Sequence, residues 1–425
     1  MTGAMSGRSD GAVALGGVAL EDVLTALRRR EAGARACYVY DLDALRQRAR
    51  RFQRAFEPLH PLTAYALKAN ALPALIEPLA AIGLGADAAS LGELEIARAA
   101  GFDAAHRVLN GNGKTPEEID WAARAGVFAV NADHIEELDL LQDAAARHGR
   151  TVRVALRVNP GIEAPVHPYV ATGGDDAKFG VAAGEALEAW AVAEQWPDLC
   201  LDGLHLHVGS QILETAAVES ALDTALDLRA EAARRGATLR LLNLGGGFGV
   251  DYKTGTDFPL ERFAQRAVER LSGAGLDLVL EPGRWLVAPV GVLVSEVLWV
   301  KRRDGQRFVV LAAGMNDLIR PALYQARHRI EPVGRRPGPS EPAVVVGPVC
   351  ESADVFATDA ELPPLERGDL VAILDTGAYG ASMASNYNGR GRLAEIVVSE
   401  GRMIRARASE GPGDLARRTE DVLEA

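Results

Sequence analysis

Between residues 60 and 288 the chain alternates eight times between a short apolar run and a longer amphipathic stretch. Short apolar runs bounded in this way indicate strands. The amphipathic stretches, such as SLGELEIARAAG and TPEEIDWAARAG, open on a polar residue and stop at a glycine, which is typical of helices. Eight βα units are the number that closes a (β/α)8 TIM barrel, and an open doubly wound sheet fits this count less well. The predicted strands cover residues 62–67, 84–89, 107–110, 127–130, 152–158, 202–208, 239–244 and 276–281.

The pattern changes after residue 288, where β-rich runs are separated by Gly and Pro turns and helical periodicity is weak. These runs are VGVLVSEVLWVKR, RFVVLAAG, AVVVGPVC, DLVAILDTG and LAEIVVSEGRMIRAR. We therefore predict a second, antiparallel β domain of the barrel or sandwich type. The predicted division is a loose N-terminal tail over 1–19, a TIM barrel over 44–288, and a β domain made of 20–43 and 289–425.

Charge and cysteine content exclude several classes of function. The net charge of −12, without a run of Lys or Arg, argues against a nucleic-acid surface. No apolar run reaches the roughly 20 residues that a membrane helix needs, so we expect no membrane association. Three cysteines in 425 residues form no disulfide framework, which indicates a reducing compartment, the cytoplasm.

Polar residues stand where the predicted barrel strands end. In a TIM barrel the chemistry lies at these carboxyl ends of the strands. Lysine is scarce here, with five among 46 basic residues, yet Lys68 ends the first strand. Only lysine can lose its proton and bind an aldehyde covalently, so its retention is informative. The other strand-end features are Asp87, Asn110, Arg157, His207, the GGGFG run at 245–249, and Glu281.

The loops after strands seven and eight, which commonly bind phosphate in this fold, read GGGFG and EPGRW. Their glycines let backbone N–H groups approach phosphate oxygens, and Arg284 adds positive charge. With Lys68 for the aldehyde and Glu281 for the pyridine nitrogen, they indicate pyridoxal 5′-phosphate (PLP). His207 can lie on the face of the ring. The alternative for His205 and His207, a metal site, lacks a third ligand at suitable spacing.

Longer motifs resemble the fold-type III PLP-dependent decarboxylases, the alanine-racemase-like family, and among them the diaminopimelate decarboxylases. They include YALKAN, RVNPGI…HPYVATGGDDAKFG, HVGSQI, LGGGFGVDY, EPGRWLVA, AGMNDLIRPALY, CESADVFA and GAYGASMASNYNGR, and the resemblance covers residues 36 to 400. It implies that Lys68 binds PLP and His207 stacks on its ring. The cofactor contacts it implies, with the strand-end Asp87 added, are Lys68, Asp87, His207, Ser210, Gly245, Gly246, Gly247, Glu281, Gly283, Arg284 and Tyr379.

The resemblance also implies a reaction, decarboxylation of meso-2,6-diaminopimelate to L-lysine and CO2, and a homodimer with shared active sites. Cys350 and Glu351 then come from the second subunit. Cys350 protonates the substrate carbon, so the implied catalytic residues are Lys68, His207, Glu281 and Cys350. The implied substrate contacts are Arg284, Arg320, Tyr324, Glu351 and Tyr379.

Three alternatives remain. The same fold and cofactor serve decarboxylases of ornithine, lysine, arginine or a carrier-tethered amino acid; a racemase and a non-catalytic regulatory homologue are the others. Arg320 speaks against a cationic distal group, and retention of Lys68, His207 and Glu281 speaks against a non-catalytic chain. The departures from the family pattern remove no functional group; they are Phe248, Ala353, Thr376 and Ala384.

Overall fold

A computed structural model describes residues 5–7, 13–159, 161, 178–334 and 336–417. Residues 160 and 162–177, which hold most of the RVNPGI…DDAKFG motif, therefore lie outside the described residues. The chain divides into two compact units. The barrel unit is formed by Leu45–Asp251 and Thr256–Val287, and the β unit contains the described parts of 1–44, 252–255 and 288–425.

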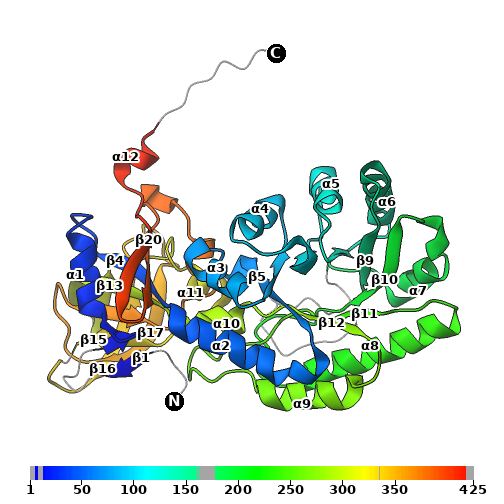
Figure 1. Ribbon diagram of the computed structural model, residues 1–425. Helices are drawn as coiled ribbons and strands as arrows, with labels where there is room; N and C mark the ends of the chain where they lie inside the picture. The colour runs from blue at the N-terminus through cyan, green and yellow to red at the C-terminus, as the bar shows by residue number, and fades with distance from the viewer. Residues whose placement is uncertain (1–4, 8–12, 160, 162–177, 335, 418–425) are drawn as a thin grey trace. The chain divides into compact units, whose positions relative to one another are not determined.

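The barrel unit is a closed ring of eight parallel strands in which β12 pairs with β5, so no sheet edge is left open (Figure 1). All eight strands lie where the apolar runs predict them, within a few residues, and the predicted TIM barrel is confirmed. The strands are β5 Leu62–Ala66, β6 Gly85–Ala88, β7 Arg107–Leu109, β8 Ala129–Ala132, β9 Val152–Arg157, β10 Leu199–His205, β11 Leu241–Asn243 and β12 Asp277–Leu280.

Helices alternate with these strands and surround them (Figure 1). Local signals set their ends. In α5, the Thr115 hydroxyl accepts the Glu118 N–H, the Glu118 carboxylate accepts the Thr115 N–H, and Gly126 ends the helix at φ +67°. The helices of the unit are α2 Leu42–Ala55, α3 Pro73–Ala81, α4 Leu91–Ala99, α5 Pro116–Ala125, α6 Glu137–His148, α7 Ala183–Ala191, α8 Ala216–Arg234, α9 Leu260–Leu271 and α10 Arg284–Val287.

The interior of the barrel is built in layers. Six apolar residues from six different strands pack into one cluster, which places them inside the ring: Ala64, Val108, Ala129, Ala155, Leu241 and Val279. Side chains alternate along a strand, so the residue two positions later also points inward. On five of these strands that residue is polar: Asn110, Asn131, Arg157, Asn243 and Glu281. The strand pattern thus creates an apolar floor beneath a polar layer at the carboxyl ends.

The β unit is built on a sheet whose main path runs β17-β16-β14-β13-β4-β19-β20, with β18 on β13 and β15 on β18. The predicted second β domain is confirmed and most of its strand pairs are antiparallel, but the sheet is mixed, because β4 pairs with β19, and β14 with β16, in parallel. Neither pair is joined by a hairpin, so no tight turn imposes the antiparallel direction. The strands are β4 Ala36–Asp41, β13 Gly291–Arg303, β14 Gln306–Leu311, β15 Ile330–Val333, β16 Glu341–Val346, β17 Val355–Leu362, β18 Leu370–Ile373, β19 Ala394–Ser399 and β20 Arg402–Arg407.

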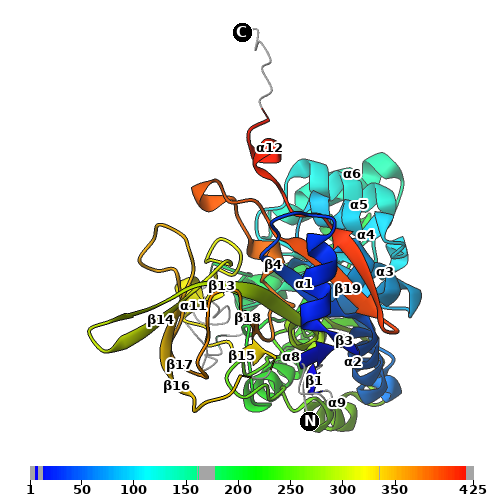
Figure 2. The ribbon, with the colours of Figure 1, turned by 90° about the vertical axis from the view of Figure 1, so that its left-hand side faces the viewer.

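The described part of the first 19 residues is not a loose tail. Val13–Leu15 (β2) and Val18–Ala19 (β3) form strands, with Met5–Gly7 (β1) beside β2. Leu15 and Val18 are buried in one apolar cluster with helix α1, Leu20–Arg28, which lies against the sheet (Figure 2). The runs are too short to show a strand period, yet burial of these apolar side chains stabilises them.

Two short helices complete the β unit, α11 Arg320–Tyr324 and α12 Pro412–Leu415. Helix α11 begins with Pro321 in its first turn, where the missing N–H of proline has no helical partner to lose. Among the described residues, no helix combines the length and the apolar character needed to cross a membrane.

Candidate active site

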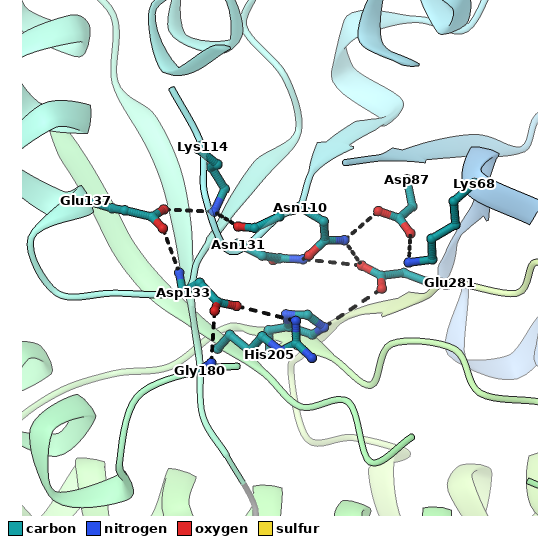
Figure 3. Close-up of polar contacts among 12 residues, drawn as sticks. Lys68, Asp87, Asn110, Lys114, Asn131, Asp133, Glu137, Gly180, His205 and Glu281 are labelled. Atoms are coloured by element: carbon teal, nitrogen blue, oxygen red, sulfur yellow. Dashed lines mark hydrogen bonds and ion pairs between the residues drawn. The ribbon is translucent and has the colours of Figure 1, made fainter. Parts of the chain in front are cut away.

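Glu281 is the centre of the polar layer. It follows β12 directly, its side chain is buried, and its Oε1 accepts hydrogen bonds from three asparagine amides. The donor distances are 2.7 Å from Asn243, 2.8 Å from Asn110 and 3.3 Å from Asn131. The other oxygen, Oε2, lies 3.8 Å from His205 Nε2 (Figure 3). The two carboxylate oxygens therefore have different surroundings, an amide cluster around Oε1 and the His205 ring beside Oε2.

Lys68 lies in a 3-10 turn, Leu67–Ala69, directly after β5, and its side chain is 46% exposed. Its Nζ is 3.4 Å from Asp87 Oδ2, while Asp87 Oδ1 accepts the Asn110 amide at 2.5 Å. Burial raises the pKa of Asp87 from 3.8 to about 6, and the charge of Glu281 adds to this, against the opposing effect of Lys68. Asn110 therefore links the carboxylate beside Lys68 to Glu281 (Figure 3).

His207 and the glycine triplet meet beside this layer. The Gly246 N–H donates to His207 Nδ1 at 3.2 Å. Burial and the charge of Arg157 hold the pKa of His207 well below its usual value, so the ring is neutral and carries its proton on Nε2. A Cβ on Gly246 would lie 2.2 Å from the Glu281 carbonyl oxygen, and Gly247 has φ +91°. Only glycine fits this close approach of the two loops.

A side-chain hydrogen bond joins the loop after β12 to the loop after β10: Arg284 is buried and its Nη2 donates to Ser210 Oγ at 2.9 Å. Gly283 packs on the end of β5, where a Cβ would lie 3.0 Å from Ala66 Cβ. The Ala66 N–H in turn donates to the Pro282 carbonyl at 3.2 Å. A polar, glycine-rich concentration of side chains and backbone groups therefore forms at one end of the ring.

A second polar cluster adjoins the first; its residues come from the ends of β7, β8 and β9, from the segments that follow them, and from helix α6 (Figure 3). Lys114 is fully buried, and its Nζ donates to Glu137 at 2.8 Å and to the Gly111 carbonyl at 2.6 Å. Burial lowers the pKa of Lys114, and Glu137 opposes that effect. Asp133 accepts the Gly180 N–H at 3.0 Å and lies 3.4 Å from Arg157. Because its ammonium is held by these oxygens, Lys114 is a structural lysine.

Comparison with known proteins identifies the family. A family model for the pyridoxal binding domain of pyridoxal-dependent decarboxylase matches residues 42–288, more than half of the chain. Diaminopimelate decarboxylase of Neisseria meningitidis serogroup B is 44% identical over 383 residues, which cover 89% of this chain and 92% of that protein. The chain belongs to the diaminopimelate decarboxylase family.

Solved structures of this family share the fold. The crystal structure of diaminopimelate decarboxylase from Helicobacter pylori, complexed with L-lysine, is 38% identical, with a TM-score of 0.86 and coverage of 91% of this chain and 97% of that one. The enzyme from M. jannaschii, in co-complex with L-lysine, is 33% identical, with a TM-score of 0.90 and 97% coverage of each chain.

The residues of the barrel fit PLP, because the matched family model describes a pyridoxal binding domain and the barrel offers a group for each part of that cofactor. An exposed amine, Lys68, stands at the rim. A buried carboxylate, Glu281, presents one oxygen away from its amide donors. The glycine triplet, with Arg284 and Ser210, offers backbone N–H groups and a guanidinium, which are the donors that a phosphate monoester requires. These three chemistries match the aldehyde, the ring nitrogen and the phosphate of PLP.

The remaining predicted residues lie in the β unit. Arg320 opens α11 and is buried; Tyr324, four residues later, ends the same helix, as the spacing predicts. Arg320 Nη1 lies 2.8 Å from His328 Nε2, and its guanidinium stacks 4.1 Å from the centre of the Tyr252 ring. His328 Nδ1 lies 2.8 Å from the Leu374 carbonyl, so it donates there, which leaves Nε2 to accept from Arg320. The arginine is therefore held in one orientation.

Cys350 and Glu351 lie on the exposed loop between β16 and β17. The Cys350 N–H donates to Asn388 Oδ1 at 2.8 Å. Asp354 anchors the loop, because its two oxygens accept the N–H groups of Met315 and Val349, each at 2.7 Å. These contacts order the loop backbone while leaving the thiol exposed.

Tyr379 is half-buried and has φ +57°, a backbone conformation that non-glycine residues rarely adopt. Strained conformations of this kind persist only where the surrounding structure imposes them, and they concentrate at functional sites. The contact with the cofactor that the resemblance implies for Tyr379 stays a prediction.

Sequence reasoning did not select Asn131 and Asn243 as site residues, although both lie in the polar layer. A signal was present: each follows an inward-facing apolar residue by two positions, Ala129 and Leu241 respectively. Asparagine within a run that otherwise reads as a buried strand requires a hydrogen-bonding partner, and here the partner is Glu281.

Replacing Asp87 with asparagine tests the electrostatics of this layer. Because the pKa of Asp87 is raised from 3.8 to about 6, the folded chain binds a proton there that the unfolded chain has lost. The contribution of Asp87 to the free energy of unfolding therefore falls as pH rises from about 4 to about 6, by up to about 3 kcal/mol.

We expect urea unfolding of cofactor-free protein to show this fall in the wild type and not in Asp87→Asn. The exposed Asp143→Asn serves as control; parallel curves for wild type and Asp87→Asn would contradict the account.

Proposed function

We propose that this enzyme uses PLP to decarboxylate meso-2,6-diaminopimelate, producing L-lysine and CO2 in lysine biosynthesis. The observation that carries the proposal is the linked set Lys68–Asp87–Asn110–Glu281 at the carboxyl ends of the barrel strands, beside the glycine triplet. The family relationship supports the same reaction, since two related enzymes of known structure are named diaminopimelate decarboxylase and were solved with L-lysine.

The barrel residues would hold the cofactor by three of its groups. Lys68 would bind the aldehyde, and Glu281 the protonated ring nitrogen, with His207 on the ring face and Asp87 beside the lysine. PLP, when bound, supplies an electron sink for the bond that breaks at the substrate Cα. The phosphate would be held by Ser210, Gly245, Gly246, Gly247, Gly283 and Arg284, with Tyr379 as a further contact.

Two atoms of the chain would act directly in the reaction, Lys68 Nζ and Cys350 Sγ. Lys68 Nζ would release the cofactor aldehyde when the substrate amine binds and would hold it again when the product leaves, and Asp87 lies beside its ammonium. The Cα–carboxylate bond breaks and CO2 departs. Cys350 Sγ then donates its proton to Cα, so that a C–H bond replaces the C–C bond, and solvent reprotonates the thiolate. Glu281 would lie at the ring nitrogen, where its carboxylate would balance a positive charge.

The distal end of the substrate carries a second carboxylate and a second ammonium. Arg320 supports recognition of that carboxylate, because its buried guanidinium is pre-oriented by His328 and Tyr252 and loses little freedom on binding. Glu351 would bind the ammonium. The other proposed substrate contacts are Arg284, Tyr324 and Tyr379.

We further propose a homodimer in the cytoplasm whose active sites are shared between subunits. In this arrangement Cys350 and Glu351 reach the barrel of the partner copy, which suits their exposed position on the β16–β17 loop. Cys37, Cys200 and Cys350 are all free thiols, as expected for a reducing compartment.

Substrate choice separates this function from decarboxylation of ornithine, lysine or arginine on the same fold. We expect CO2 release from meso-diaminopimelate and none above background from the LL or DD isomers, lysine or ornithine. In Arg320→Gln the KM for meso-diaminopimelate should rise about 10- to 100-fold, while kcat changes little, because a bidentate charged contact is lost. Trapping of labelled CO2 measures both.

The control is Arg327→Gln, which removes a surface arginine paired with Asp359 from the segment after α11. It should leave KM unchanged. Faster turnover of ornithine than of meso-diaminopimelate by the wild type, or an unchanged KM in Arg320→Gln, would count against the assignment.

A further inference from the structure

We propose that Asn110, Asn131 and Asn243 are positioning residues that hold Glu281 as an anion and aim its Oε2 at the ring nitrogen of PLP. The inference rests on the proposed function, since it concerns the residue that would face that nitrogen. None of the three need touch the cofactor; they act through Glu281. They lie on three separate strands or strand ends, β7, β8 and β11, and all three are buried.

The amides distinguish the two carboxylate oxygens. All three Nδ2 groups donate to Oε1 and none to Oε2. An oxygen that accepts three N–H donors has no room for a proton of its own. Any proton on Glu281 must therefore bind Oε2. A cationic partner must also bind at Oε2. The cluster selects which oxygen is offered.

The orientation of each amide is fixed by its other contacts. Asn243 and Asn110 are fixed through their oxygens, and Asn131 is fixed because its Nδ2 lies between two acceptors, Asn110 Oδ1 and Glu281 Oε1. Asn243 Oδ1 accepts the Gly245 N–H at 2.8 Å, which fixes its Nδ2 toward Glu281. Asn110 Oδ1 accepts the Asn131 amide at 2.7 Å, which fixes Asn110 in the same sense. A reversed amide would bring an oxygen against Oε1 and repel it. The donors are therefore permanent features of the site.

The same contacts tie together the three proposed points of cofactor attachment. Asn243 joins Glu281 to Gly245, the first residue of the glycine triplet, and Asn110 joins Glu281 to Asp87, the neighbour of Lys68. These side-chain amides therefore link the residues proposed to contact the aldehyde, the ring nitrogen and the phosphate of PLP. Preorganisation of this kind avoids rearrangement when charge develops during the reaction.

Other charged and titratable groups also surround Glu281. The charges of Asp87 on β6 and Arg157 on β9 interact with the charge of Glu281, and Lys68 after β5 lies beside Asp87. Burial and the charge of Arg157 hold the pKa of His205 on β10 well below its usual value, so it adds no positive charge next to Oε2. With a like charge at Asp87, the amide donors supply the hydrogen bonds that hold the Glu281 carboxylate.

The test is the protonation state of the ring nitrogen in holoenzyme reconstituted with PLP labelled with 15N at that atom. Removing a donor makes Glu281 more basic, so the proton shifts from the ring toward Oε2. For Asn131→Leu and Asn243→Leu we expect about a tenfold shift of this equilibrium for each donor removed, seen as a 15N shift toward the unprotonated value. We expect the larger effect from Asn243, whose contact is shorter.

Gln142→Leu is the matched control. It removes an amide on α6 that donates to Asp198 at 2.6 Å in the same barrel and is remote from the polar layer. It should lower stability without moving the 15N signal. If Asn131→Leu fails to fold, Asn131→Ala replaces it, because the smaller alanine side chain fits the buried position without a clash.

Three negative outcomes can be told apart. If the wild type binds PLP with a protonated ring nitrogen and the asparagine variants give the same 15N shift, the positioning role of the asparagines is refuted and the proposed function stands. If the wild type does not bind PLP, the proposed function and the positioning role both fail. A signal that moves in Gln142→Leu as much as in the asparagine variants would also refute the positioning role, since the effect would then follow stability alone.

Discussion

Lys68→Ala should release no CO2 from meso-diaminopimelate and should lose the visible absorbance of the lysine-bound cofactor. The amine of Lys68 is the proposed covalent attachment point for the cofactor. Among the described residues, the other lysine near the polar layer of the barrel is Lys114, and its buried ammonium is paired with Glu137. We expect turnover to fall by at least about a thousandfold. The absorbance spectrum and the rate of CO2 release measure the two effects on the same preparation.

Two further variants separate covalent chemistry from charge. Lys68→Arg keeps a cation beside Asp87 but cannot bind an aldehyde, so it should be as inactive as Lys68→Ala. Lys301→Ala, at an exposed position of β13, should behave as the wild type. Substantial activity in Lys68→Arg would mean that the residue serves only as the ionic partner of Asp87.

Cys350→Ala should lower turnover by about a hundredfold or more, because the protonated thiol is the proposed acid for Cα. The thiol is exposed and its loop is held by backbone contacts, so the substitution leaves the packing intact. Unchanged thermal stability, with the rate reduced, would separate the chemical effect from a structural one. The rate of CO2 release and a melting curve of the same sample measure both.

Mixing Cys350→Ala with Lys68→Ala subunits tests whether sites are shared. If each site combines Lys68 of one copy with Cys350 of the other, random association restores one complete site in every mixed dimer, and activity returns to about a quarter of the wild-type value. If both residues of a site came from one copy, the mixture would show no more activity than the two variants apart. Ser352→Ala in place of Cys350→Ala is the control, since it should be fully active alone.

The barrel could be predicted because its strands are buried and therefore uninterrupted in sequence. The β unit was harder for a physical reason. Strand β17, VFATDAEL, carries alanine and acidic residues that favour no strand, and its pairing with β16 decides its structure. The parallel pairing of β4 with β19 joins segments separated by nearly the whole chain, and no local pattern reports such a contact. The N-terminal strands were missed because two or three residues show no period.

The site residues also differ in whether they could be predicted from the sequence. Residues with distinctive chemistry at strand ends, Lys68, Asp87 and Glu281, could be selected from the sequence, since the fold brings such ends to one rim. Asn131 and Asn243 have no distinctive reactivity, and their importance follows from the inward direction of β8 and β11 together with the position of Glu281. The contacts that orient Arg320 could likewise not be predicted from the sequence, because His328 and Tyr252 contact it only in the folded β unit.

Borohydride reduction of the purified protein, followed by mapping of its peptides by mass spectrometry, tests whether Lys68 holds the cofactor. Reduction makes the bond between cofactor and lysine permanent, so the pyridoxyl group marks the lysine that held it. We expect one label per chain, on the peptide that contains Lys68. A label on Lys114 or on any other lysine, or a reduced protein without label, would contradict this assignment.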